Sequence, residues 1–212
     1  MIKKNLKKLL LTSTVILLPL LAGIILWDKL PDSVPVHFGP SGEADGYASR
    51  AVAVFVMPFV MLAFHWLCTL GTAADPKNKN IDKKALGLVL WICPMISLLV
   101  NGVIYVTALG IAINILMVFG LFFGCLFVVI GNYMPKCRQS YTLGIKLPWT
   151  LNDEENWNRT HRFAGRLWTV GGLAVIITAF LGKAFVFVFL GLVLLMVIIP
   201  TVYSYLLYKK NK

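Results

Sequence analysis

Six long apolar runs, separated by polar segments, dominate the chain. Apolar side chains are nearly continuous within each run, rather than recurring with a strand period. About 20 apolar residues at 1.5 Å per residue match the hydrocarbon thickness of a bilayer. Backbone inside lipid must satisfy its own hydrogen bonds, so each run is expected to be a transmembrane helix. The runs cover about Leu9–Trp27, Ala51–Leu70, Ala85–Val106, Ile111–Tyr133, Leu167–Leu181 and Phe185–Leu207.

Composition supports the same class. Apolar residues make up 58% of the 212 residues and charged residues only 14%, whereas soluble domains average about 25% charged. The first run follows a basic lead-in, but it is longer than a signal-peptide core and no small-x-small cleavage site follows it. We therefore expect a retained helix, and an all-α integral membrane protein of six transmembrane helices.

The basic residues are distributed unevenly among the segments that connect the runs. Seventeen of the 20 lysines and arginines lie in the two tails, the second loop and the fourth loop, and only three lie in the alternate loops. The positive-inside rule then places both termini in the cytoplasm. The net charge of +11 is explained by this topology and by anionic lipid of the bilayer, so direct binding of nucleic acid is not expected.

The membrane runs carry little chemistry. All nine acidic residues lie outside them, and intramembrane carboxylates are the usual mark of proton relays and ion-coupled transport. The chain has no HExxH, GxSxG or P-loop motif, and its four cysteines show no CxxC spacing. We expect no enzyme, no cofactor and no metal site. His65, inside the second run, is either a hydrogen-bonding partner of a neighbouring helix or a functional intramembrane group.

The first loop, residues 28–50, is expected on the outer face. Val34, Val36 and Phe38 alternate with other residues, which favours an extended segment. The turn signals at 39–42 and 45–46 predict a hairpin-like cap. This loop is either a lid on the bundle or a platform for a ligand, and its four acids against two bases favour a cationic one.

The fourth loop, residues 134–166, is expected on the inner face. Asn152 followed by Glu155 is a capping signature and predicts that a helix starts there and continues into the fifth span. On a helical wheel Trp157, His161, Ala164 and Trp168 share one face. Arg159, Arg162 and Arg166 lie opposite, and this arginine stripe is expected to meet either lipid phosphate or an acidic protein partner.

These two loops resemble the SdpI family of bacterial membrane proteins over nearly the whole chain. The resemblance divides the chain into an N-terminal DUF1648-type module at 1–70, a third helix with its flanks at 71–110, and an SdpI-like region at 111–212. The outer residues that match are Pro31, Pro35, His37, Gly39, Gly42, Asp45 and Gly46. The inner matches include Asn132, Arg138, Tyr141, Pro148, Trp149, Trp157, His161 and Arg162. The chain departs from the inner pattern at Gln139-Ser140 and Lys146-Leu147.

The resemblance implies an immunity protein of a bacterial cytoplasmic membrane that protects against a secreted, membrane-active toxic peptide. It also implies signal transduction, in which the protein holds a small winged-helix repressor at the membrane. The outer matches would then bind the ligand, and the inner matches, with Arg159 and Arg166, would bind the partner. The alternative is a small-molecule or lipid transporter with inverted repeats, which the three-helix halves and His65 suggest.

Overall fold

The apolar runs are helical in the computed structural model, which describes residues 2–81 and 83–210. The helices and strands are α1 (Ile2–Ile25), β1 (Ser33–Phe38), β2 (Ala44–Ser49), α2 (Met57–Ala74), α3 (Lys83–Ala108), α4 (Ile115–Tyr133), α5 (Pro148–Asn152), α6 (Glu154–Thr178) and α7 (Ala184–Lys210). Single turns of tighter helix lie at Trp27–Lys29, Asn78–Asn80 and Met134–Lys136, and a π-helical turn, Val52–Val56, leads into α2. The fourth helix starts at Ile115 rather than at Ile111.

Within the described residues, five helical stretches are long and apolar enough to cross a membrane. They are Ile2–Ile25, Val52–Ala74, Lys83–Ala108, Ile115–Lys136 and Ala184–Lys210. Helix α6 contains the sixth predicted span, but charged residues fill its first half and the apolar part of the helix begins only at Leu167. The structure thus gives an all-α membrane protein, while the count of six spans and the side of the termini remain predictions.

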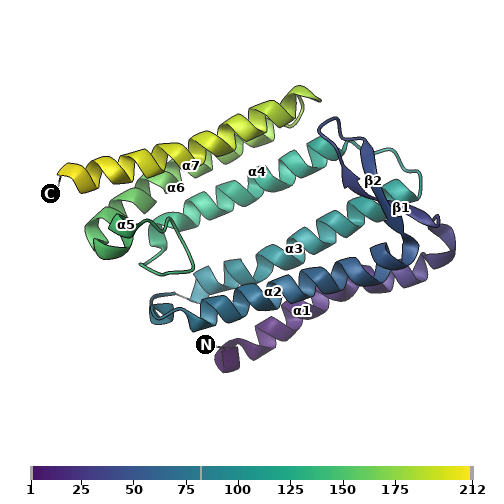
Figure 1. Ribbon diagram of the computed structural model, residues 1–212, viewed down its shortest axis with the longest axis horizontal. Helices are drawn as coiled ribbons and strands as arrows, with labels where there is room; N and C mark the ends of the chain where they lie inside the picture. The colour runs from purple at the N-terminus through teal and green to yellow at the C-terminus, as the bar shows by residue number, and fades with distance from the viewer. Residues whose placement is uncertain (1, 82, 211–212) are drawn as a thin grey trace. The chain divides into compact units, whose positions relative to one another are not determined.

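The chain divides into two compact units, which are described separately. Unit 1 comprises Met1–Ala74 and Leu86–Ile115, and unit 2 comprises Asp75–Ala85 and Leu116–Lys212. In unit 1 the hairpin of β1 and β2 covers the end of the helices remote from the start of α1 (Figure 1). Its core contains Leu30, Val34, Ala53, Val54, Ile104 and Tyr105.

Polar contacts join the three helices of unit 1. The Thr12 hydroxyl of α1 donates to the Leu9 carbonyl and lies 3.1 Å from Nε2 of His65 on α2. The Tyr105 hydroxyl of α3 donates to the Pro19 carbonyl at 3.1 Å. The hydrophobic effect does not drive helices together within lipid, so hydrogen bonds and close packing hold them together instead. His65 is therefore bonded to a neighbouring helix, as one of the two interpretations of this residue predicted.

In unit 2 α6 packs between α4 and α7. A methyl group added at Gly131 of α4 would lie 2.6 Å from the backbone nitrogen of Thr169, so α6 approaches α4 backbone to backbone. On the other side, Nε1 of Trp168 donates to the Met196 carbonyl of α7 at 3.0 Å. Val175 at the apolar end of α6 is fully buried. These contacts fix which face of α6 points inward.

Candidate functional site

The candidate site expected on the outer face, called the outer site, is the β1–β2 hairpin, which confirms the extended segment and the turn predicted from the sequence. The strands are antiparallel, with Val34 opposite Ala48 and His37 opposite Gly46. Gly42 in the connecting turn has φ +80°, a conformation that side chains other than glycine rarely adopt. The turn signal and the alternating residues were thus sufficient to find this hairpin.

Four resemblance residues of the hairpin, His37, Asp45, Gly39 and Gly46, lie together. His37 Nδ1 lies 2.5 Å from Asp45 Oδ1, and both side chains are well exposed, at 74% and 51%. A methyl group added at Gly46 would lie 2.8 Å from His37 Cβ, and one at Gly39 would lie 2.8 Å from Asp45 Oδ2. The glycines therefore make room for the pair. Pro35 is buried in β1, and Pro31 is exposed just before it.

Arg50 fastens the hairpin to the end of α1. Its Nη1 donates to the Trp27 carbonyl at 2.6 Å, its Nη2 pairs with the Asp32 carboxylate, and its guanidinium lies 5.1 Å from the Trp27 ring centroid. A planar guanidinium has several N–H donors along its edge and a face for a ring, so it can contact a carbonyl, a carboxylate and a ring at once. The hairpin is thus held as an ordered cap on unit 1, and it presents His37 and Asp45 outward.

The candidate site expected on the inner face, called the inner site, is centred on Asp75, directly after α2 in sequence. One carboxylate oxygen accepts from the Tyr141 N–H at 2.9 Å and from the N–H and hydroxyl of Thr142 at 2.9 and 2.8 Å. The other oxygen accepts from the Lys77 N–H at 2.7 Å. Burial acts to raise the pKa of Asp75, but these four hydrogen bonds together hold it below its usual range. An ionised Asp75 therefore clamps residues 75–77 to residues 141–142.

Gln139 adds a second set of bonds to this clamp. Its side-chain oxygen accepts from Lys77 Nζ at 2.9 Å, and its side-chain nitrogen donates to the Thr150 carbonyl at 2.8 Å. Its backbone carbonyl accepts from Asn80 Nδ2 at 2.8 Å. One residue thus links the 77–80 turn to the start of α5. Gln139 is one of the positions where the chain departs from the family pattern.

His161 of α6 holds the segment 134–152, called the inner segment, against this helix. The Ile145 N–H donates to its Nε2 at 2.9 Å, so that nitrogen carries no proton, and Nδ1 donates to the Trp157 carbonyl at 2.8 Å. This arrangement needs a neutral ring with the proton on Nδ1. Burial lowers the pKa of His161 to about 4, against the opposing effect of the bond to Trp157. Gly144, with φ +104°, lets the backbone pass so close that an added methyl group would lie 2.4 Å from Nε2.

Two tryptophans secure the ends of the inner segment. Trp157 is fully buried, stacks on His161, and donates from Nε1 to the Cys137 carbonyl at 2.8 Å. Trp149 is half-buried in α5 and donates from Nε1 to the Ser204 hydroxyl of α7 at 2.7 Å. Pro148 occupies the first turn of α5, where its missing N–H is not needed. The loop expected at 134–166 is therefore a packed segment with its own short helix.

The cap of α6 lies one residue later than the sequence predicted. Asp153, not Asn152, has the extended backbone of a capping residue, and its side chain accepts from the Asn156 N–H at 3.0 Å. Asn152 is taken up by the last turn of α5, so its backbone is already helical. Glu154 and Glu155 then occupy the first turn of α6, where negative charge is favourable.

The other residues predicted for the inner site are exposed at the protein surface. Asn132 at the end of α4 is exposed, and so are Arg138 and Tyr141, with Lys77 Nζ lying 5.4 Å from the Tyr141 ring centroid. The predicted arginine stripe is also exposed, opposite the buried Trp157, His161 and Ala164, whereas Trp168 is half-buried. In the stripe, Arg159 pairs with Glu155 at 3.3 Å, Arg162 Nε donates to the Asn158 carbonyl at 3.3 Å, and Arg166 is exposed.

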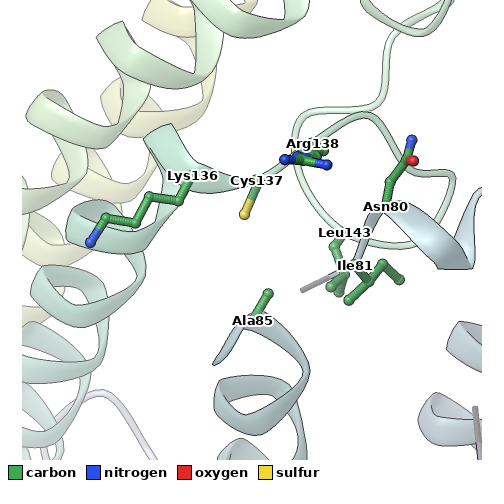
Figure 2. Close-up of a pocket in the computed structure, with 7 residues that line it drawn as sticks. All are labelled: Asn80, Ile81, Ala85, Lys136, Cys137, Arg138 and Leu143. Carbon is green, nitrogen blue, oxygen red and sulfur yellow. The ribbon is translucent and has the colours of Figure 1, made fainter. Parts of the chain in front are cut away.

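Two hollows border this surface. A small one of about 10 Å³ has space for about one water molecule, and Figure 2 shows Arg138 and Asn80 above it, Ala85 below it, and the Lys136 side chain directed away. An open recess of about 440 Å³ is lined by Asn80, Arg138, Gln139, Glu154 and Asn158. Only the recess is large enough for side chains of a partner. Among residues 2–81 and 83–210, no group of three or more His, Cys, Asp or Glu side chains is placed to hold a metal ion.

Sequence reasoning missed Asp75, Gln139 and the buried Asn156–Ser204 contact. Asn156 Nδ2 donates to the Ser204 carbonyl at 3.0 Å, and the Ser204 hydroxyl donates to Asn156 Oδ1 at 2.9 Å. An Asp-Pro pair just after a helix is a recognisable turn signal for Asp75. It does not reveal the partner, because Tyr141 lies 66 residues away in sequence.

Two family models match separate parts of the chain. The model of the SdpI/YfhL protein family matches residues 136–204, which include most of the inner segment with α6. A domain of unknown function, DUF1648, matches residues 14–62, which include the hairpin. Immunity protein SdpI of Bacillus subtilis (strain 168) is 30% identical over 209 residues, covering 96% of this chain and 97% of the relative. The chain belongs to the SdpI family.

This similarity confirms the resemblance to the SdpI family, which the sequence showed over nearly the whole chain. No solved structure matches the chain. The hairpin, the inner segment and α6 contain most of the residues that carry the resemblance.

Proposed function

We propose that this chain is a membrane immunity protein that protects its cell against a secreted, membrane-active toxic peptide. The observation that carries the proposal is the similarity, over 96% of the chain, to a protein named as an immunity protein. The lack of a metal-binding group in the described residues and the absence of a catalytic motif in the sequence are compatible with a binding role. Protection is then expected to come from binding rather than from chemistry.

The proposed topology has six spans with both termini in the cytoplasm. The distribution of lysine and arginine supports it, since seventeen lie in the tails and the second and fourth loops. In this topology α6 crosses the membrane through its apolar second half. The β1–β2 hairpin then faces the outside, and the segment held by Asp75 faces the cytoplasm.

The hairpin is proposed as the surface that receives the peptide. Around it lie Asp28, Asp32, Glu43 and Asp45, against Lys29 and Arg50. Arg50 is already engaged by Trp27 and Asp32, so the charge left to face a ligand is negative. A rigid acidic surface suits a cationic peptide, because little ordering is required when it binds.

The inner segment is proposed to bind a cytoplasmic partner, a small winged-helix repressor. The open recess offers Arg138, Glu154, Asn158 and the exposed Tyr141, a mixture of charge, amide and aromatic groups found at protein interfaces. Because Asp75, Gln139 and His161 hold this surface in one conformation, loosening them would change partner binding without altering the hairpin. Ligand binding outside would shift the population from this conformation toward a second one, in which the register or tilt of α6 differs.

The test is survival of sensitive cells. Cells without an immunity gene would express this chain and be challenged with the secreted killing peptide that the family's namesake resists, with that namesake as the positive control. If the chain is an immunity protein, its expression should restore growth. The double variant His37→Ala, Asp45→Ala should reduce protection. Lys29→Ala, at an exposed residue beside the hairpin, is the control. Unchanged killing, at equal amounts of protein in the membrane, would count against immunity.

A further inference from the structure

The exposed face of α6 changes its chemistry part-way along the helix. Arg159, Arg162 and Arg166 are exposed in its first half. At the next helical spacings come Val170, Leu173 and Ile177, exposed at 64%, 49% and 71%. Residues three or four apart share a helix face, so one continuous stripe passes from guanidinium to hydrocarbon. At 1.5 Å per residue, Arg166 and Val170 are about 6 Å apart along the axis.

Packing on its opposite face fixes the orientation of α6, so this stripe stays exposed. The opposite face buries Trp157, His161, Ala164 and Val175 completely, and the Trp168 ring is bonded to α7. Three aliphatic side chains so exposed on a fixed face need lipid around them. The boundary between water and lipid must then lie near Arg166.

The length of the apolar half of α6 shows at what depth in the bilayer the arginines lie. Residues 167–178, the apolar part of α6, extend about 18 Å as a helix, against a hydrocarbon thickness of about 30 Å. The turn after Thr178 and the turns that carry Arg166 and Arg162 together make up the shortfall of about 12 Å. Long basic side chains at such a position extend toward the interface, and the bilayer thins around a short span. Both guanidinium groups thereby reach the level of the lipid phosphates.

The three arginines make fewer hydrogen bonds and ion pairs the closer they lie to the apolar half of α6. Arg159 is paired with Glu155, whereas Arg162 has a single bond at 3.3 Å, to the Asn158 carbonyl. Arg166 makes no hydrogen bond or ion pair within residues 2–81 and 83–210. The donors of the stripe are thus least satisfied where the helix meets the bilayer.

We propose that Arg162 and Arg166 form a binding site for the phosphate of anionic phospholipid headgroups, and that Arg159 remains in water with Glu155. A guanidinium offers paired N–H donors that match phosphate oxygens. The continuity with exposed aliphatic residues favours lipid over an acidic protein, because a protein on this site would have to reach the edge of the hydrocarbon. The inference rests on the proposed insertion of α6 and not on immunity.

The experiment titrates dioctanoyl phosphatidylglycerol into the purified full chain in neutral detergent and follows the thermal unfolding midpoint. Phosphatidylcholine of the same chain length and inorganic phosphate are the comparison ligands. We expect phosphatidylglycerol to raise the midpoint at lower concentrations than either. The half-saturating concentration should rise about fivefold for Arg162→Gln and for Arg166→Gln, which corresponds to about 1 kcal/mol per basic residue. Arg166→Lys should recover part of the loss, and Arg138→Gln, which removes the same charge elsewhere on unit 2, should titrate as the unmodified protein.

Several results would overturn the site. Equal stabilisation by phosphatidylcholine or by inorganic phosphate would mean that no headgroup is recognised. An equal loss in Arg138→Gln would mean that only total charge matters. A dimer that dissociates on Arg166→Gln would show that a second copy covers the face. Labelling of Leu173→Cys, in the middle of the apolar half, by an impermeant maleimide in a cysteine-free background in vesicles would instead show that α6 is not inserted, which separates failure of the topology from failure of the site.

Discussion

Removing the Asp75 carboxylate should release the inner segment while leaving unit 1 intact. Asp75→Ala takes away the acceptor of four hydrogen bonds, three of which come from Tyr141 and Thr142. Asp75→Asn is the milder change. An amide oxygen facing Tyr141 and Thr142 keeps three acceptor contacts, but its NH₂ group then faces the Lys77 N–H and the negative charge is gone.

The size of the effect follows from the number and type of bonds. A hydrogen bond to a charged group contributes about 1.5–3 kcal/mol, and the contributions do not add fully. Tyr141 is exposed, so water replaces part of what is lost. We expect the free energy of local opening to fall by about 3 kcal/mol for Asp75→Ala and by about 1.5 kcal/mol for Asp75→Asn. These values correspond to increases of about 150-fold and about 10-fold in the open population.

Hydrogen exchange measured by mass spectrometry on the detergent-solubilised chain reads this opening at the backbone amides. Peptides containing Tyr141 and Thr142 should lose protection, while peptides of the β1–β2 hairpin should not change. Glu154→Gln is the matched control, since it removes an exposed carboxylate from the same recess without removing an acceptor of these amides.

The protection of these amides from exchange should also depend on pH, in a direction set by the lowered pKa of Asp75. The folded pKa of Asp75 lies below its ordinary value, so its contribution is complete above the unfolded pKa of about 4 and is lost as pH falls through the folded pKa. Protection at Tyr141 and Thr142 should therefore weaken in acid, and Asp75→Asn should remove that dependence. Unmodified protection at these two amides in Asp75→Ala would refute the clamp.

Three further predictions use other parts of the chain. Because the folded pKa of His161 is about 4, against about 6.5 unfolded, the free energy of unfolding should fall by about 3 kcal/mol as pH drops from 7 to 4; thermal melts should show a much weaker dependence in His161→Asn. Gly144→Ala should destabilise by more than 2 kcal/mol, from strain and contact with His161, whereas Gly182→Ala, also at positive φ but with open space around it, should cost about 1 kcal/mol in the same melts. His65→Ala should cost about 1 kcal/mol through its Thr12 contact and leave immunity intact; complete loss of protection, with normal expression, would instead support the transporter alternative.

Much of the outer site could be predicted from the sequence because its interactions are local. The alternation of Val34, Val36 and Phe38 and the turn glycines lie within one hairpin. His37 and Asp45 are only eight residues apart, so the turn itself brings them together. The arginine stripe of α6 was equally accessible, since a helix converts spacing directly into a face.

The rest of the inner site depends on distances that no local pattern contains. Asp75 and Tyr141 are separated by 66 residues, and Trp149 and Ser204 by 55. The capping residue was misplaced by one position because α5 extends through Asn152. Its helical state depends on how the preceding turn packs, not on the capping signature alone.

The sequence by itself determined the class of the protein, the approximate spans, the hairpin and the stripe, because bilayer thickness, strand alternation and helix periodicity each act on neighbouring residues. Only the tertiary structure decided which polar groups are satisfied inside and which remain exposed. It buried His161 as a neutral acceptor and gave Asp75 four donors, while leaving Arg162 and Arg166 on an exposed face. The physical reason is that hydrogen-bond partners are chosen by packing between distant segments, where each buried donor or acceptor must be matched and each exposed one is free to meet something else.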